Sequence, residues 1–511
     1  MQVCPASVCL GIINHNVYGK CPVQNCPDLP SFPERADCGI VGRHYAGRDG
    51  GHVATLEWEG KHAVTVYLER MRRGVLQVDP ALSRGAAQGG DRIILGDNLA
   101  ALDALVPDHA GRVDMVLTDP PYNTGRRAWL YDDSASTPAG LHWLDAALGP
   151  AVARALSRQD RWLCLMYPRL LYLRRLMAEH GVIACCIDDR EYPRLRLLME
   201  EVFGAENFLA TFVWVNTGNI DNHSRIKTNH EYVVVFARDA RRFVPGRVLA
   251  PQVGARSKLR RPVIRNTIVK NGPRNPVRDL VLPAGFPASF DHGVIPVPVD
   301  PAFWPRFTAP MEVRAGRLVH PVTLRSGWSS RRQCAAFIAA GFKDITDRQG
   351  LKTRFYLTAS GAVFMEKDRQ DQPSHILTVL QGMGTVQQAS AALARCGVRF
   401  DYPKPLPLVT YLLRALCPDP GALVLDAFGG SGTTAQAVMD LNAADGGTRR
   451  FVVMEMDERI ATTVTQPRLA HVLARHARAG TGFRFCRVVM PPSAQDAEMA
   501  IPVGHEAAHE N

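Results

Sequence analysis

The chain has 511 residues, and its 60 lysines and arginines outnumber its 49 aspartates and glutamates, which gives a formal net charge of +11. This length exceeds one ordinary hydrophobic core and predicts about three domains, and the charge favours a polyanionic partner. No apolar run is long enough to span a membrane, and the 12 scattered cysteines argue against a disulfide framework, so we expect a cytoplasmic protein.

Residues 1–85 form a leader whose structure the sequence does not predict. Its start, MQVCPASVCLGII, lacks a basic segment before an apolar core, so we expect no secretion signal. The pairs Cys4/Cys9 and Cys21/Cys26 share one spacing, which would suit a zinc site. The surrounding sequence is rich in proline, however, and we prefer an irregular leader without a metal.

A short strand ends at an unusual turn in the stretch VDMVLTDPPYNTG, residues 113–125. The apolar run from Val113 to Leu117 is too short for an independent helix, and the prolines that follow cannot continue a ladder of strand hydrogen bonds. We therefore predict a buried strand with the DPPY tetrad at its carboxyl end. In an open α/β sheet this edge is where ligands bind.

The residue types of this tetrad suit an exocyclic amine on a nucleobase, whose nitrogen is a poor nucleophile. Asp119 and the backbone carbonyl of Pro120 would accept both N–H bonds and aim the nitrogen lone pair at an electrophile. The rings of Pro120 and Pro121 would hold these acceptors in place, and Tyr122 offers a flat face on which an extruded base can stack. The alternative is an ordinary loop, because aspartate and proline are common turn residues.

The stretch TNHEYVVVFAR, residues 228–238, places His230 and Glu231 before an apolar run. A metal site or a general-base pair is one interpretation of these two side chains. No third ligand is evident nearby, so we prefer the start of a strand at the edge of an active site.

A strongly basic span follows, with eleven lysines and arginines between Arg241 and Leu280 against the single acid Asp279. Such a span is not expected to build a core, and it resembles a loop or arm that lies along phosphates. A solvated loop is the alternative. Trp304 and Trp328, further along, could touch bases or fill the core of a small domain, and we expect the core. The cations expected to contact DNA are Arg256, Lys258, Arg260 and Arg261.

A second turn lies in the stretch GALVLDAFGGSGTTAQAVMDLN, residues 421–442. We predict a buried strand over 422–425, a glycine-rich turn over 426–432 and a helix from Thr433 onward, an arrangement that allows close approach of a ligand to the backbone. The turn lacks a P-loop lysine and departs from the dinucleotide fingerprint. The next predicted strand ends at Glu455, 23 residues beyond Gly432, a separation at which an acidic residue can meet ribose hydroxyls.

The two turns resemble the catalytic and cofactor motifs of S-adenosylmethionine-dependent DNA amino-methyltransferases. The catalytic motif comes first, which is similar to the circularly permuted β group of that family. The stretches LGDNLAALDAL, TNHEYVVVFAR and FDYPKPLPLV, together with EWEGK near residue 60, are most similar to the Mod subunits of Type III restriction-modification systems. The resemblance covers roughly residues 55–490 and is weakest in the middle.

The resemblance implies a role for each matching residue. Glu455 would bind the cofactor ribose, Asp426 and the glycine turn would cradle its methionine part, Phe428 would pack against it, and Lys404 would pair with its carboxylate. Asp97 would meet the adenine amino group, although a helix N-cap is the alternative for this residue. The positions assigned to the cofactor are Asp97, Lys404, Asp426, Phe428, Gly430, Gly432, Thr433, Thr434 and Glu455.

We therefore predict an α/β fold with a Rossmann-like, doubly wound methyltransferase sheet in permuted order and an inserted target-recognition domain. The expected parts are a leader (1–85), a catalytic half (86–240), a target-recognition region (241–395), a cofactor half (396–490) and a mobile tail (491–511). The implied function is transfer of a methyl group from S-adenosyl-L-methionine to N6 of a flipped adenine in double-stranded DNA, without a metal. The implied partners are a second copy of the chain and a restriction subunit.

Three other functions are compatible with parts of the sequence. N4-cytosine methylation needs the same amine-holding geometry, although an aspartate at position 119 favours adenine within this family. A DNA-binding module without catalysis would not need both intact motifs. A Rossmann oxidoreductase is disfavoured by the DPPY tetrad and by the glycine pattern.

Overall fold

The computed structural model describes most of the chain between residues 55 and 490. The leader cysteines, the tail and two of the expected DNA contacts, Arg256 and Lys258, lie outside the described residues. Within the described part, no helix is long and apolar enough to cross a membrane. The described ranges are 55–71, 73–86, 90–125, 138–216, 225–254, 257, 260–300, 302–348, 350–369, 376–476 and 480–490.

A ten-stranded sheet forms the main body, in the order β1-β19-β2-β18-β17-β3-β4-β6-β5-β16. Six neighbouring strands, from β19 to β4, run parallel. An antiparallel strand flanks this group on each side, β1 next to β19 and β6 next to β4. The strands are β1 (Val75–Gly85), β2 (Arg92–Leu95), β3 (Val113–Thr118), β4 (Met177–Ile187), β5 (Phe208–Val215), β6 (His230–Ala237), β16 (Val379–Leu380), β17 (Leu423–Asp426), β18 (Arg450–Glu455) and β19 (Gly482–Val489).

Alternating side chains of these strands build two cores, one on each face of the sheet. In β3, Val116 belongs to one core, whereas Met115 and Leu117 belong to the other. This period of two, with both faces apolar, is typical of a parallel sheet covered by helices. The expected doubly wound α/β fold is therefore confirmed.

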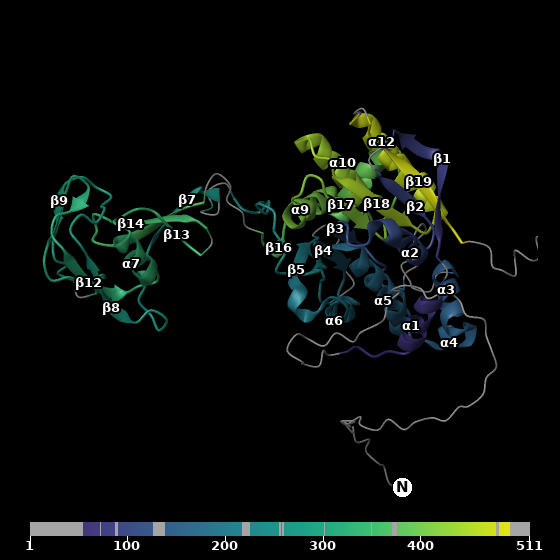
Figure 1. Cartoon of the computed structure of the whole chain (residues 1–511), viewed down its shortest axis with the longest axis horizontal. Helices are drawn as coiled ribbons and strands as arrows, with labels where there is room; N and C mark the ends of the chain where they lie inside the picture. Colours follow the sequence, from purple (N-terminus) through teal and green to yellow (C-terminus); the bar gives the residue numbers. More distant parts are fainter. Residues whose placement is uncertain are drawn as a thin grey trace, which may run out of the picture. The chain divides into compact units, whose positions relative to one another are not determined.

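Helices cover both faces of the sheet, as Figure 1 shows. One core contains residues of α1 (Lys61–Arg70), α2 (Asn98–His109), α3 (Pro138–Leu148), α4 (Pro150–Ala155), α5 (Arg158–Leu176) and α6 (Tyr192–Phe203). The other contains residues of α9 (Leu406–Leu416), α10 (Thr433–Asp445) and α12 (Gln466–Arg475). The remaining helical segments of this body are η1 (Ala205–Asn207), α8 (Val386–Arg395), α11 (Glu458–Ile460) and the π-helical η3 (Ala461–Thr465).

The strand order brings the two turn motifs together. β17 lies beside β3 in parallel register, with Val424 opposite Met115 and Leu425 opposite Val116. Both motifs follow the carboxyl ends of these neighbouring strands, although they are about 300 residues apart in the chain. In the sheet, β17 and β18 lie between β2 and β3. The two motifs are therefore neighbours, although the catalytic motif comes first in the chain.

The sheet extends beyond the boundaries expected from the sequence. β1 pairs with β19 from Val75↔Val489 to Gly85↔Gly482, so the sheet begins before residue 86. β16 pairs with β5, so residues 379 and 380 belong to this sheet rather than to the inserted region. Neither boundary could be predicted from the local sequence, because each of these edge strands forms its hydrogen bonds with a strand that is distant in the chain.

The inserted region forms smaller sheets around its own core between β7 and β15. Trp328 lies in this core at 6% exposure, as expected, whereas Trp304 is half-buried and stacks on the guanidinium of Arg306. The elements are β7 (Val263–Thr267), β8 (Val277–Leu282), β9 (Gly293–Ile295), β10 (Met311–Arg314), β11 (Arg317–Leu318), β12 (Val322–Gly327), α7 (Arg331–Ala339), β13 (Ile345–Thr346), β14 (Lys352–Leu357) and β15 (Val363–Asp368).

The basic span 241–280 is not an irregular arm throughout, and that expectation is wrong for residues 263–267 and for residues 277–280, where β8 begins. These residues form β7 and the start of β8, and Leu280 and Leu282 are buried in the core of the inserted region. Arg278 of β8 is exposed and precedes these buried leucines, so one strand supplies both a core and a basic surface.

Candidate active site

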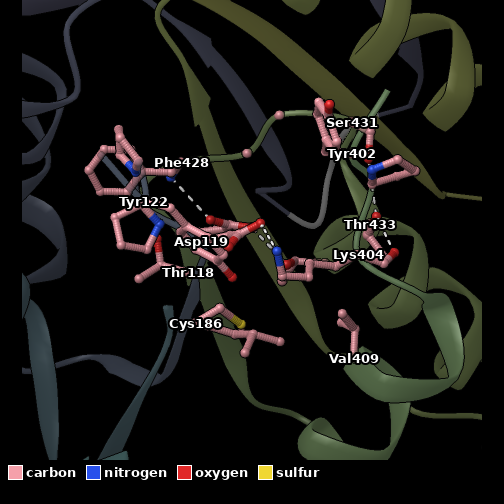
Figure 2. A pocket seen from close by; sticks show the side chains of 18 of the residues that line it. Thr118, Asp119, Tyr122, Cys186, Tyr402, Lys404, Val409, Phe428, Ser431 and Thr433 are labelled. Atoms are coloured by element: carbon pink, nitrogen blue, oxygen red, sulfur yellow. Dashed lines mark hydrogen bonds and ion pairs between the residues drawn. The ribbon is translucent and has the colours of Figure 1, made fainter. Parts of the chain in front are cut away.

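A cavity of about 400 Å³ opens at the carboxyl ends of β3 and β17 (Figure 2). Its volume is in the range of small-molecule sites, which is roughly 300–1,000 Å³. The DPPY tetrad and most of the glycine turn line it, although Gly432 does not, so the structure joins the two predicted motifs in one site. The other lining residues are Leu117, Thr118, Thr124, Cys186, Arg190, Glu231, Val386, Phe400, Tyr402, Pro403, Lys404, Val409, Asp426, Ser431, Thr433 and Thr434.

Asp119 presents one occupied and one open carboxylate oxygen. Its Oδ2 accepts a hydrogen bond from the Lys404 ammonium at 2.7 Å, and Figure 2 shows the two side chains pointing toward one another. Its Oδ1 is buried and has no partner among the described residues. Burial raises the pKa of this carboxyl, while the adjacent ammonium acts in the opposite direction. An unpartnered buried acceptor calls for a donor from a ligand.

The rest of the tetrad is held by Glu231 and by two side chains that the sequence analysis did not identify, Trp162 and Glu191. Trp162 donates its indole N–H to the carbonyl of Pro121 at 2.7 Å. Tyr122 donates its hydroxyl to Glu231 Oε2 at 2.8 Å. The next residue, Asn123, has a φ of 57° and donates its side-chain amide to Glu191 at 2.6 Å. These contacts fix the turn from α5, from β6 and from the residue before α6, so the acceptors and the ring are preorganised.

Glu231 lies at the cavity, as expected for a strand start at an active-site edge. It lies at the start of β6, which pairs with β4, and β4 in turn pairs with β3, the strand that precedes the tetrad. His230 instead contacts Tyr232, and no group of three or more potential metal ligands occurs in the described ranges. No sequence signal distinguished Glu231 from its neighbour as the residue that faces the tetrad.

The glycine turn depends on backbone conformations that favour glycine. Gly430 and Gly432 have φ values of 47° and 77°, and a Cβ on Gly429 would lie 3.0 Å from the carbonyl oxygen of Met454. The turn therefore leaves its backbone open toward the cavity. Phe428, within the turn, also lines the cavity (Figure 2).

Glu455 supports this turn from the end of β18. Its Oε2 accepts from the backbone N–H of Gly430 and its Oε1 from that of Asp457, both at 2.9 Å. Burial raises the pKa of this carboxyl to about 7. Glu455 does not itself line the cavity, so its expected contact with ribose stays a prediction.

Asp426 and the two threonines link the turn to the loop before α9. Asp426 accepts from the hydroxyl of Thr434 at 2.7 Å and from the N–H of Phe428 at 3.1 Å, and burial raises its pKa to about 6. Thr433 donates to the carbonyl oxygen of Lys404 at 3.3 Å. The buried guanidinium of Arg468, which the sequence analysis did not identify, donates to Ser431 and Thr433.

Asp97 and Lys404, two residues that were expected to contact the cofactor, instead contact other residues of the chain. Asp97 caps α2, because its Oδ1 accepts from the N–H groups of Leu99 and Ala100, and its Oδ2 pairs with Arg169 at 3.1 Å. Asp97 is thus the N-cap of α2, which was the alternative expectation for this residue, and it does not line the cavity. Lys404 does line the cavity, but in this structure it pairs with Asp119 rather than standing free for a cofactor carboxylate.

The remaining expected DNA contacts, Arg260 and Arg261, are exposed. Arg260 donates its Nε–H to the carbonyl oxygen of Val253 at 2.8 Å, which anchors one end of its guanidinium. The contact of these two side chains with DNA stays a prediction.

The family model for DNA methylases, N6_N4_Mtase, matches residues 113–466. This match includes both turns of the cavity. The chain belongs to this family. The match begins at β3 and ends at the start of α12, so the methylase model spans the inserted region as well.

Similar curated proteins include Mod subunits of Type III restriction-modification enzymes. The chain is 29% identical over 388 residues to the StyLTI Mod subunit of Salmonella typhimurium, and the match covers 72% of this chain and 52% of that relative. It is 29% identical over 434 residues to the EcoPI Mod subunit of Escherichia phage P1, covering 80% and 64%. The Type II methyltransferase M.KpnI of Klebsiella pneumoniae is 26% identical over 380 residues, covering 73% and 82%. The matched part thus spans about half to two thirds of the two Mod relatives.

Proposed function

We propose that this chain is a site-specific DNA methyltransferase that transfers a methyl group from S-adenosyl-L-methionine to N6 of a flipped adenine. The observation that carries the proposal is the open Oδ1 of Asp119 in a cavity shared with the glycine turn. An acceptor for an amine and a backbone cradle for a cofactor thus lie in one site of suitable volume. Membership of the DNA methylase family supports the same conclusion.

In the proposed reaction, the chain positions the amine. Asp119 Oδ1 and the carbonyl of Pro120 accept its two N–H bonds, which orients the nitrogen lone pair, and Tyr122 stacks on the base. The bound cofactor supplies a methyl group that its sulfonium already activates. The main tasks of the protein are therefore alignment and exclusion of water.

The cofactor assignment fits the residues present. The positive-φ glycines allow close approach, Phe428 offers an apolar face, and Lys404 offers a cation near the turn. Thr433 and Thr434 place hydroxyls at the start of α10, although both already have partners. Glu455 and Asp97 remain the proposed contacts to the ribose and the adenine, and each would have to exchange a present hydrogen bond or use a remaining lone pair.

The inserted region supports DNA as the substrate. A hollow of about 530 Å³ beside α7 is lined by five exposed arginines and by no acidic residue. None of these five forms an ion pair with a residue that the structure describes, so their charge is available to phosphates. The arginines are Arg274, Arg278, Arg331, Arg332 and Arg348.

The system to which the methylase belongs is a further part of the proposal. Two of the relatives above are Mod subunits of Type III restriction-modification enzymes, which supports a Type III-like modification subunit. Its partners would be a second copy of the chain and a restriction subunit. Co-expression with a restriction subunit of a Type III system, followed by light scattering of the purified protein, measures both associations.

The test is expression of the full chain in a host without DNA methylation, followed by sequencing that distinguishes methylated adenine from methylated cytosine. Methyladenine at one recurring sequence is the expected result, and Asp119→Ala should abolish it. Methylcytosine instead would establish the N4-cytosine alternative, which uses the same amine-holding geometry. DNA binding without any modification would indicate a catalytically silent module.

A further inference from the structure

Glu231 lies where one ammonium is shared by two carboxylates. Lys404 Nζ is 2.7 Å from Asp119 Oδ2 and 3.5 Å from Glu231 Oε2, and it also lies 4.8 Å from the ring centroid of Tyr122. All three charged side chains are largely removed from solvent, with exposures of 29% for Asp119, 18% for Glu231 and 13% for Lys404. In such a site, charge pairs are weakly screened and strongly coupled.

The proposed reaction needs Asp119 for the target amine, yet Lys404 occupies one of its oxygens. A buried ammonium that leaves one carboxylate needs another anion nearby. Glu231 is the second carboxylate within 4.0 Å of Lys404, so the move requires only a small displacement. The same Glu231 oxygen also holds the hydroxyl of Tyr122.

We propose that Glu231 is a positioning residue, which takes the Lys404 ammonium from Asp119 when the target amine binds and fixes the ring of Tyr122 through its hydroxyl. This inference rests on the proposed function. It assigns a role to a residue outside the DPPY tetrad and the glycine turn.

A second consequence concerns charge. Two carboxylates share one ammonium, so the cluster keeps one net negative charge next to the proposed cofactor site. The cofactor carries a sulfonium cation, whereas its demethylated product, S-adenosylhomocysteine, is a neutral thioether at that atom. Glu231 therefore favours the charged cofactor over the spent product, because an anion stabilises the cation alone.

The other titratable groups that face Asp119 do not replace this charge. Burial raises the pKa values of the Cys185 and Cys186 thiols and of the Tyr122 hydroxyl well above their usual ranges, which keeps these groups neutral. The carboxyl of Asp426, whose pKa is about 6, accepts hydrogen bonds from Thr434 and from the N–H of Phe428. Its charge is present in the wild type and in every variant, so it does not account for a difference between them. Removal of the Glu231 charge therefore leaves Lys404 paired with Asp119 alone.

The first experiment compares cofactor and product binding to the full chain by calorimetry, without DNA. Glu231→Gln keeps the size and an oxygen acceptor for Tyr122 but removes the charge, and it should reduce the preference for S-adenosylmethionine over S-adenosylhomocysteine by about 3- to 10-fold. Tyr122→Phe is the matched control, because it removes the hydroxyl bond and keeps the charge. Its preference should stay at the wild-type value, and Glu231→Asp should restore most of the preference.

The second experiment measures kcat against pH on DNA. Because the Glu231 charge raises the pKa of Asp119 and the Tyr122 hydroxyl lowers it, the acid limb should move to lower pH in Glu231→Gln but not in Tyr122→Phe, where any shift should be to higher pH. Loss of about 10-fold in kcat is expected for Glu231→Gln, since Lys404 then competes with the amine for Asp119. An unchanged binding preference and an unmoved acid limb, in a folded variant, would overturn the proposal. Failure of the proposed function looks different, because the wild-type chain would then methylate no DNA.

Discussion

The cavity of the large sheet and the hollow of the inserted region use positive charge in opposite ways. In the cavity, Lys404 is buried and paired with Asp119 and Glu231. In the hollow, the five lining arginines are exposed and form no ion pair within the described ranges. A buried charge that is confined between fixed partners suits a small ligand, whereas unpaired surface charges suit a polyanion that exchanges its counterions.

This contrast predicts different sensitivities for the two regions. Changes in the cavity should affect catalysis and cofactor binding and should respond to pH. Changes in the hollow should affect DNA affinity and should respond to salt.

The largest effect is expected for Asp119→Ala. The variant loses the open acceptor for the target amine, and its methylation rate should fall by at least about 100-fold, while the glycine turn still binds cofactor. Radiolabelled methyl transfer and calorimetry measure the two properties. Asp108→Ala, on the exposed side of α2, is the control and should retain activity. A rate within a few-fold of wild type in Asp119→Ala would show that the amine is held elsewhere.

Cofactor affinity should fall by about 10-fold or more in Gly430→Val, because its φ of 47° is unfavourable for a branched residue and the turn must stay open to the ligand. Gly446→Val is a matched control. Gly446 has a φ of 76° at the C-terminal end of α10, and a Cβ at this position would meet no atom within 4 Å, so it shares the backbone strain but not the site. Equal losses of cofactor affinity in the two variants would mean that strain alone explains the result.

A smaller effect is expected when Arg274, Arg278 and Arg332 are all changed to glutamine. Affinity for specific and random duplexes should fall alike, and the dependence of binding on salt should decrease by up to about three units of slope, about one for each lost phosphate contact. Arg314→Gln with Arg317→Gln, on the β10–β11 hairpin, provides the control. If the DNA sequence that is methylated changed instead, one of the three arginines would contact a base. Loss of such a contact costs about 1–3 kcal/mol of discrimination between bases.

The smallest effect concerns pH and stability without cofactor. Because the pKa of Glu455 is raised to about 7 in the folded chain, the folded state binds a proton more tightly than the unfolded state does. The contribution of this group to stability is therefore full below its unfolded pKa of about 4.3 and is lost as pH rises to about 7. Glu455→Gln should reduce the difference in Tm between pH 5 and pH 8 by about 2–4 °C, while the exposed Glu59→Gln should not. An equal difference in wild type and Glu455→Gln would contradict the buried titration.

Local patterns predicted much of the fold. The apolar runs over 113–117 and 451–454 form β3 and β18, and the glycine turn leads into α10 at Thr433, as expected. These elements were predictable because their strands are buried on both faces and because glycine at positive φ marks the turn. Asp97 shows the limit of this approach, since the same residue fits a cap and a ligand contact.

The sequence by itself determined the two turn chemistries, the α/β class and the presence of a separate inserted region. The tertiary structure decided that Lys404 meets Asp119 across 285 positions, that Glu231 meets Tyr122 across 109, and that β1 pairs with β19 at one edge of the sheet. The physical reason is that turns and buried strands depend on neighbouring residues. The partners of a charge or of an edge strand, in contrast, depend on the order in which strands assemble, which no local pattern specifies.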